Sequence, residues 1–117
     1  MIYDLEDRTL NFSKDLIRTL KKIKVNHLNS SVIKQLIRSG TSIGANYREA
    51  NGALTKKEFA NRISISKKES KETRYWIEVL AEIENDRLEH LRYLWKEANE
   101  LIMIFGKIMY KTKENKN

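Results

Sequence analysis

The chain has no cysteine and no proline, and only four of its 117 residues are glycine. The absence of cysteine excludes disulfides, thiolate nucleophiles and cysteine-ligated metal sites, and it agrees with a reducing compartment. Without proline, and with so few glycines, almost nothing interrupts long helices. An all-β chain of this size would need many turns, which are built from the residues that are missing. The composition therefore predicts an all-α protein.

Long apolar runs are also missing. The longest, residues 101–105, is far too short to span a membrane. The first seven residues are acidic and contain no apolar signal core. Hydrophobic residues make up 40% of the chain, which is enough to fill one core. We expect one cytoplasmic domain with no membrane partner.

Apolar residues recur at the spacing of amphipathic helices in most of the chain. The expected helices cover residues 4–25, 30–51, 55–83 and 86–110. Asn29 or Ser30 is the expected N-cap of the second helix. Because the joints are short, neighbouring helices should run antiparallel, as an up-down-up-down four-helix bundle over residues 1–110. Residues 111–117 form a polar tail that we expect to fray.

Three further sequence signals mark the expected helix ends. Gly52 should end the second helix, with the chain turning left-handed there. Thr55 and Glu58 have the spacing of a capping box at the start of the third helix. Asp86 and Glu89 repeat that spacing at the start of the fourth.

The middles of the second and third helices contain small residues where a bundle stripe is normally apolar. Ser66, Ser70 and Thr73 occupy the stripe of the third helix, and Gly40 and Gly44 interrupt the second. A mid-helix glycine costs on the order of 1 kcal/mol relative to alanine. Either these two helices cross here, small residue against small residue, or a polar seam serves a subunit contact or a ligand. The candidate seam residues are Arg38, Ser39, Ser42, Asn46 and Glu49.

The last two helices carry more apolar residues than one bundle stripe needs. In the fourth helix, a second apolar column is repeated every seven residues. The surplus either widens the core or forms a surface for a partner. We expect self-association. The candidate interface residues are Trp76, Trp95, Ile102 and Met109.

The formal net charge is +7, and none of the four expected helices carries more than +2 of it. A solvated surface of mixed charge would explain this distribution, and so would a nucleic-acid contact surface. No helix-turn-helix or RNA-motif signature accompanies the lysines. The candidate phosphate contacts are Lys21, Lys22, Lys24, Lys56, Lys57, Lys67, Lys68 and Lys71.

A catalytic constellation is missing from the sequence. His27 and His90 are isolated, and four scattered glycines make no phosphate-binding loop. Four acidic residues surround the last joint, where they either hold a divalent ion or form a solvated patch that favours a helix N-terminus. They are Glu82, Glu84, Asp86 and Glu89, and His90 lies in the same cluster. We expect no enzymatic activity, no cofactor and no bound metal.

Residues 35–50, QLIRSGTSIGANYREA, resemble the second-helix signature of the bacterial four helix bundle proteins, also called 23S rRNA-intervening-sequence proteins. Residues 59–65 and 67–76 resemble the second block of that family. The resemblance implies an up-down bundle, homopentameric assembly and no enzymatic activity. It also implies a relationship to the accessory protein of diversity-generating retroelements, which binds RNA and a reverse transcriptase.

Three hypotheses follow. The first is a non-enzymatic homo-oligomer, with a pentamer favoured, that binds RNA or another nucleic acid. The second is an interaction scaffold for a protein such as a reverse transcriptase. The third is a small metalloenzyme built on the acidic joint.

Overall fold

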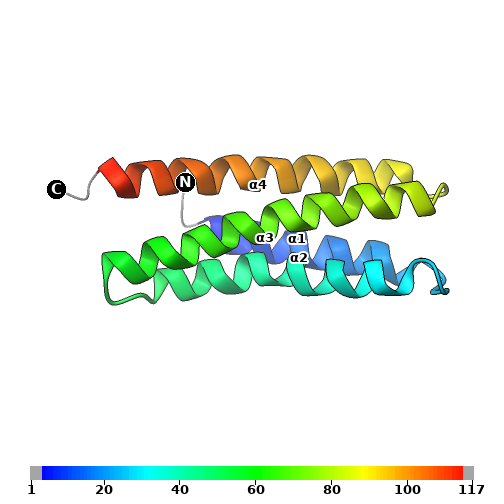
Figure 1. Cartoon of the computed structure of the whole chain (residues 1–117), viewed down its shortest axis with the longest axis horizontal. Helices are drawn as coiled ribbons and strands as arrows, with labels where there is room; N and C mark the ends of the chain where they lie inside the picture. The colour runs from blue at the N-terminus through cyan, green and yellow to red at the C-terminus, as the bar shows by residue number, and fades with distance from the viewer. Residues whose placement is uncertain (1–3, 115–117) are drawn as a thin grey trace.

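The computed structural model describes residues 4–114, and the side chains of residues 4–113. Within these residues the chain forms four helices and no strand. They are α1 (Asp4–Lys21), α2 (Ser30–Asn51), α3 (Lys56–Ile83) and α4 (Leu88–Glu114). Consecutive helices run in opposite directions along a rod of 51 × 20 × 20 Å (Figure 1). The prediction of an all-α four-helix bundle is confirmed.

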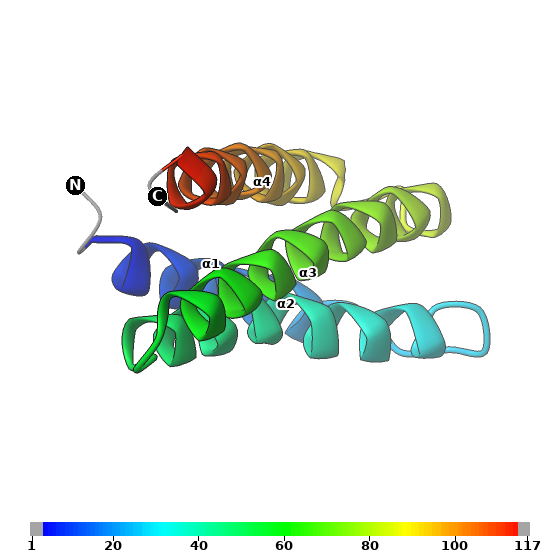
Figure 2. The same cartoon turned by 60° about the vertical axis from the view of Figure 1, so that its left-hand side comes forward.

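The four helices contact one another unequally. α3 makes extensive contacts with both α2 and α4, whereas α1 contacts α2 and touches α4 least. Figure 2 shows α3 crossing the bundle, with α4 set apart from α1 and α2. The border between α1 and α4 is therefore the most open side of the bundle.

The core follows the predicted apolar stripes. Phe12 and Leu16 of α1, Tyr47 of α2 and Phe105 of α4 are all buried, and the rings of Tyr47 and Phe105 lie 5.9 Å apart. Burying such a side chain contributes about 1.5–3 kcal/mol, so this shared core holds the four helices together. The apolar spacing of α2 would include Ile37 in this core, but Ile37 is 40% exposed.

α1 ends at Lys21, four residues before the predicted Val25. In the joint that follows, two asparagine side chains bind backbone groups that a longer helix would have used. Asn26 Oδ1 accepts hydrogen bonds from the backbone N–H groups of Leu28 (2.9 Å) and Asn29 (3.0 Å). Asn29 is the N-cap of α2, but its Oδ1 accepts from the backbone of Asn26 at 2.8 Å and makes no capping hydrogen bond to α2.

The other helix ends differ in part from the predictions. Gly52 ends α2 with φ −94°, so no left-handed turn occurs there. Thr55 accepts from the N–H of Glu58 at 3.1 Å, which is one half of the predicted capping box. α4 begins at Leu88, too late for Asp86 to cap it.

The C-terminal end of α4 also departs from the prediction. Residues 111–114 of the predicted tail belong to α4, and residues 115–117 lie outside the described residues. In the described part of the chain, no helix has the length and apolar character needed to cross a membrane.

Candidate nucleic-acid interface

The polar seam predicted on α2 lies against α3. The Arg38 guanidinium contacts the carboxylates of Glu69, at 3.3 Å, and Glu72. Two further polar residues meet at the same border between α2 and α3, where Arg62 donates a hydrogen bond to Asn46 Oδ1 at 3.0 Å. The hydrogen bond from Arg38 to Glu72 is the main cause that raises the pKa of Arg38 above its ordinary value. The guanidinium therefore stays charged and ties the two helices together.

The small hydroxyl residues form the buried part of this contact. Thr73 donates to Ser39 Oγ at 2.9 Å, and Ser66 donates to the backbone carbonyl of Ile43 at 3.0 Å. All three hydroxyl residues are fully buried. No buried side-chain polar atom of the described residues lacks a hydrogen-bond partner. The seam thus joins α2 to α3 within one subunit, as the first alternative for these residues proposed.

The remaining two seam residues take less part in this contact. Ser42 is partly buried and donates to the carbonyl of Arg38, one turn earlier in α2, at 2.6 Å. Glu49 is exposed near the end of α2. A hydrogen bond from a serine hydroxyl to a carbonyl of its own helix satisfies the side chain without fixing a neighbouring helix.

The two glycines of α2 face α1 and not α3. A Cβ atom at Gly40 would lie 2.2 Å from Leu16 Cδ2, and one at Gly44 would lie 2.9 Å from Thr9 Oγ1. The prediction that small residues of α2 and α3 meet is correct for the hydroxyls and wrong for the glycines. Spacing places both glycines on one face, but it does not say which helix that face meets.

The two tryptophans lie on opposite sides of α3. Trp76 Nε1 donates to Glu72 at 3.2 Å, on the side of α3 that faces α2. Trp95, on α4, donates to Glu78 at 2.9 Å and lies under the Arg74 guanidinium, whose carbon is 5.8 Å from the ring centre. Trp95 is partly buried by contacts within the subunit, and its place at a subunit interface stays a prediction.

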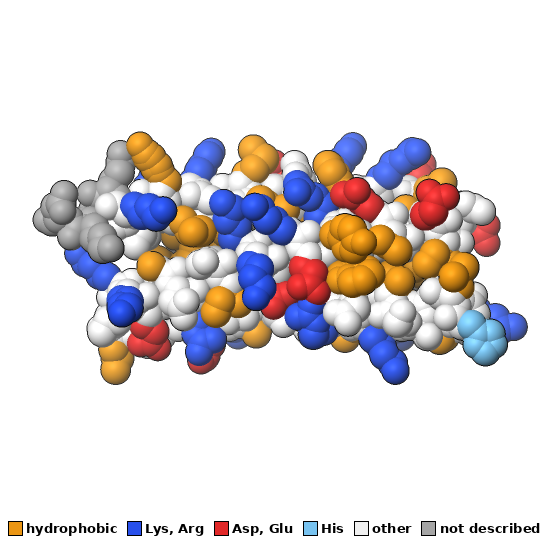
Figure 3. Space-filling view, viewed as in Figure 1, with side chains coloured by type: hydrophobic (Ala, Val, Ile, Leu, Met, Phe, Trp, Pro, Cys, Tyr) orange, Lys and Arg blue, Asp and Glu red, His pale blue; other side chains and the backbone are white. Residues whose placement is uncertain are grey.

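The other two candidate interface residues are also used within the chain. Ile102 is only 8% exposed. Met109 is partly buried in a groove between α3 and α4 that Lys56 and Lys57 also line. What remains is the apolar flank of α3, which we define as Trp76, Val79 and Ile83. Figure 3 shows hydrophobic side chains gathered over this second half of α3 and its border with α2.

The candidate lysines occupy two ends of the rod. Lys21, Lys22 and Lys24 follow α1 to the end where residues 84–87 join α3 to α4, and Arg87 there donates to the carbonyl of Lys22 at 2.9 Å. The five candidate lysines of α3 lie nearer the other end or at mid-length. They are Lys56, Lys57, Lys67, Lys68 and Lys71.

Antiparallel packing places those five lysines in the same half of the rod as three lysines in the second half of α4, which the sequence alone did not single out. Lys67 extends over Gly106, with Nζ 3.7 Å from where a Cβ atom would be. Residues 56–71 and 101–113 together hold nine Lys or Arg and two Glu, so the remaining residues are neutral in sum. Lysine and arginine side chains follow this border in Figure 3. The added lysines are Lys107, Lys111 and Lys113. We name these two segments the basic half.

The lysines of the basic half are not neutralised by ion pairs. In the described part of the chain, every ion pair is made by an arginine. No lysine lies within 4.0 Å of a carboxylate there. Lysine ammonium groups without such partners remain available to external anions, such as the phosphate groups of nucleic acids.

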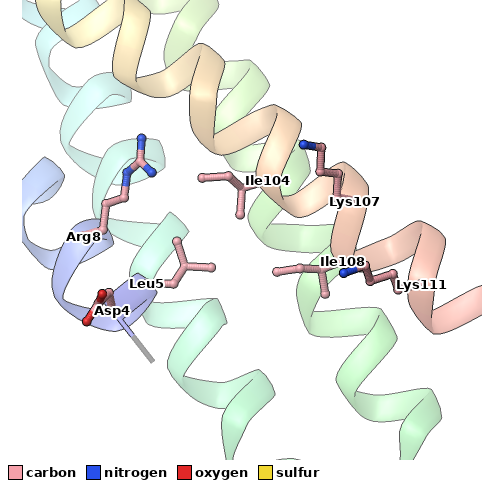
Figure 4. A pocket seen from close by; sticks show the side chains of 7 residues that line it. All are labelled: Asp4, Leu5, Arg8, Ile104, Lys107, Ile108 and Lys111. Atoms are coloured by element: carbon pink, nitrogen blue, oxygen red, sulfur yellow. The ribbon is translucent and has the colours of Figure 1, made fainter. Parts of the chain in front are cut away.

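A shallow groove opens between α1 and α4. Leu5, Ile104 and Ile108 form its apolar floor, and Lys107 and Lys111 stand on its rim (Figure 4). The groove lies along the border where neighbouring helices contact each other least.

Arg8, which also lines the groove, bridges the same border with ion pairs to Glu97 and Glu100. The Arg8 guanidinium donates two hydrogen bonds to Glu97, at 2.7 and 2.9 Å. Those bonds are the main reason why the pKa of Arg8 is raised.

The acidic joint does not assemble a metal site in this part of the structure. Among the described residues, no group of three His, Cys, Asp or Glu side chains is placed to hold a metal ion. Glu84 instead accepts a hydrogen bond from the Asn29 side chain at 3.0 Å. The expectation that the protein has no metal and no activity stays a prediction.

Residues 4–107 match the family described as 23S rRNA-intervening sequence protein. The chain belongs to this family. It is also similar to a crystal structure, at 1.70 Å, of a protein of unknown function from the S23 ribosomal protein family of Bacteroides thetaiotaomicron. The two sequences are 32% identical, the TM-score is 0.77, and the match covers 89% of this chain and 96% of that one. No curated protein matches the chain.

Membership of the 23S rRNA-intervening sequence protein family covers the whole α2–α3 seam and most of the basic half. The matched range ends at Lys107 and so excludes Lys111 and Lys113. The seam residues therefore lie within the matched range, whereas the last two lysines of the basic half lie beyond it.

Proposed function

We propose that this chain is a non-enzymatic, cytoplasmic homo-oligomer, with a pentamer favoured, that binds RNA through its basic half. The observation that carries the proposal is the gathering of the whole net charge of +7 into residues 56–71 and 101–113. Charge spread along the whole rod would serve only solubility, but the same charge gathered in one half of the rod attracts a polyanion.

Oligomerisation would multiply this effect. A cyclic assembly repeats the basic half once for each subunit, so the field that an RNA strand meets increases with the number of copies. The apolar flank of α3 is the surface best suited to the subunit contact, because Trp76, Val79 and Ile83 are all only partly buried. The pentamer itself rests on the family resemblance.

A gel shift with a structured RNA, at several salt concentrations, tests the proposed binding. We expect a complex that weakens steeply as salt rises, because each neutralised phosphate releases counterions. A variant with Lys56, Lys57 and Lys67 changed to Ala should weaken the complex. Changing Lys14, Lys34 and Lys96 to Ala, outside the basic half, is the matched control. Absence of binding at about 50 mM salt would exclude the proposal.

The groove between α1 and α4 favours a second candidate function, a scaffold for a protein partner such as the reverse transcriptase of a diversity-generating retroelement. Its apolar floor and lysine rim suit an acidic segment with one apolar side chain. Purified reverse transcriptase and the chain should then form a complex that Ile104→Glu abolishes. A complex unchanged by that substitution would argue against the groove.

A further inference from the structure

The solvent face of α3 carries one continuous row of residues at helical spacing, which we name the α3 ridge. All of its members are exposed. They are Lys57, Asn61, Ser64, Lys68, Lys71 and Tyr75. We infer that the α3 ridge binds the sugar-phosphate backbone of double-stranded RNA. This inference rests on the proposed function and names the class of RNA.

Every side chain of the ridge can donate a hydrogen bond, and no carboxylate interrupts it before Glu78. Ammonium, amide, hydroxyl and phenol groups are the ones that proteins direct at phosphate and sugar oxygens. The nearest acidic side chains are used elsewhere. Glu58 lies 3.4 Å from the backbone N–H of Leu54, while Glu69 and Glu72 bind Arg38. On the ridge itself, an approaching phosphate therefore meets hydrogen-bond donors and no carboxylate before Glu78.

The ridge is straight and held rigidly. Residues 57 to 75 lie within one uninterrupted helix, so the row is about 27 Å long at 1.5 Å per residue. The opposite face of α3 is fixed by the buried residues Ser66, Ser70 and Thr73, all of which are hydrogen-bonded. A rigid row of donors on the scale of one duplex turn complements a rigid duplex better than a flexible strand.

The composition of the ridge disfavours single strands and DNA. Single-stranded RNA is bound by aromatic side chains that stack on successive bases. Among the exposed residues of the ridge only Tyr75 is aromatic, and its ring meets the edge of Trp76 at 5.0 Å between centres. Asn61 and Ser64, in the middle of the row, can bond a 2′-hydroxyl, which DNA lacks.

Fluorescence anisotropy with the full chain tests the inference, using three probes of one arbitrary sequence. These are a 20-base-pair RNA duplex, one of its strands alone, and the DNA duplex. We expect the RNA duplex to bind at least about tenfold more tightly than the single strand, and more tightly than the DNA.

Two substitutions on the ridge distinguish binding at the ridge from general electrostatic attraction of RNA to the protein. Lys68→Ala with Lys71→Ala should weaken duplex binding about tenfold or more and should reduce the slope of log K against log salt by about 2. Lys14→Ala with Lys34→Ala removes the same charge from α1 and α2 and should have a smaller effect. Thermal denaturation followed by circular dichroism establishes that each variant is folded.

The outcomes distinguish the ridge from the proposed function. Equal or tighter binding of the single strand overturns the assignment to duplex RNA, and so does a ridge variant that loses no more affinity than its control. In both cases RNA binding by the basic half would stand. Failure of all three probes to bind at about 50 mM salt would overturn both proposals together.

Discussion

Gly44 of α2 lies against Thr9 of α1 so closely that a Cβ atom on Gly44 would be 2.9 Å from the Thr9 hydroxyl and 3.1 Å from Thr9 Cβ. The threonine has little freedom to move away. Its side chain is β-branched, is fully buried, and donates hydrogen bonds to the carbonyls of Leu5 at 2.8 Å and Glu6 at 3.0 Å. α1 and α2 can approach this closely only because position 44 has no side chain.

Gly44→Ala should therefore destabilise the protein by about 1–2 kcal/mol, because overpacking outweighs the gain in helix propensity. Gly40→Ala is the matched comparison. There the Cβ atom would meet Leu16 Cδ2, which lies at the far end of a flexible side chain. That side chain can change its torsion angles, so we expect a smaller loss. Urea denaturation measures both. A Gly44→Ala variant as stable as the parent would show that α1 shifts freely.

Arg38→Ala should destabilise the protein by about 1–3 kcal/mol, because it leaves the carboxylate of Glu69, which is only 8% exposed, without its cation. The arginine is itself 46% exposed, so the loss stays below that of a fully buried pair. In a Glu69→Gln background the same change should cost less. Equal losses in both backgrounds, measured by urea denaturation, would mean that the ion pair contributes nothing.

Asn29→Ala should also cost about 1–3 kcal/mol. The Asn29 side chain is fully buried and joins the two loops at one end of the rod, donating to the Lys24 carbonyl and the Glu84 carboxylate, both at 3.0 Å. The nearby exposed Asn85, changed to Ala, is the control. The prediction fails if the two variants have the same melting temperature.

Trp76→Ala should reduce the mass of the assembly measured by light scattering, from about 70 kDa for five copies of a 13.9 kDa chain. Trp95→Ala should instead lower the melting temperature and leave the mass unchanged, because Trp95 contacts Arg74 and Glu78 of its own subunit. A parent protein that is monomeric would contradict the proposed oligomer.

The helices and most of the core could be predicted because their signals are local. The spacing of Phe12 and Leu16, or of Ile63 and Ile77, defines a buried stripe whatever the neighbouring helix is. The end of α1 was not predictable in this way. It depends on hydrogen bonds from Asn29 to atoms of both loops, including Glu84, 55 residues away.

The candidate interface was harder to predict because it depends on which segments become neighbours. Counted by expected helix, no range carries a net charge above +2. Antiparallel packing of α3 and α4 then brings residues 56–71 and residues 101–113 into the same half of the rod, where the excess gathers. For the same reason the sequence did not predict that Gly40 faces α1. A helical face can be predicted from the sequence, whereas the helix that packs against it cannot.

The division between arginine and lysine described above separates two uses of positive charge. Arginines such as Arg8 and Arg38 hold helices together, whereas the lysines of the basic half hold nothing within the subunit. Acetylation neutralises lysine and leaves arginine unchanged. A lysine acetyltransferase acting on α3 and α4 would thus weaken the proposed attraction for a polyanion and leave in place the arginine ion pairs of the described residues.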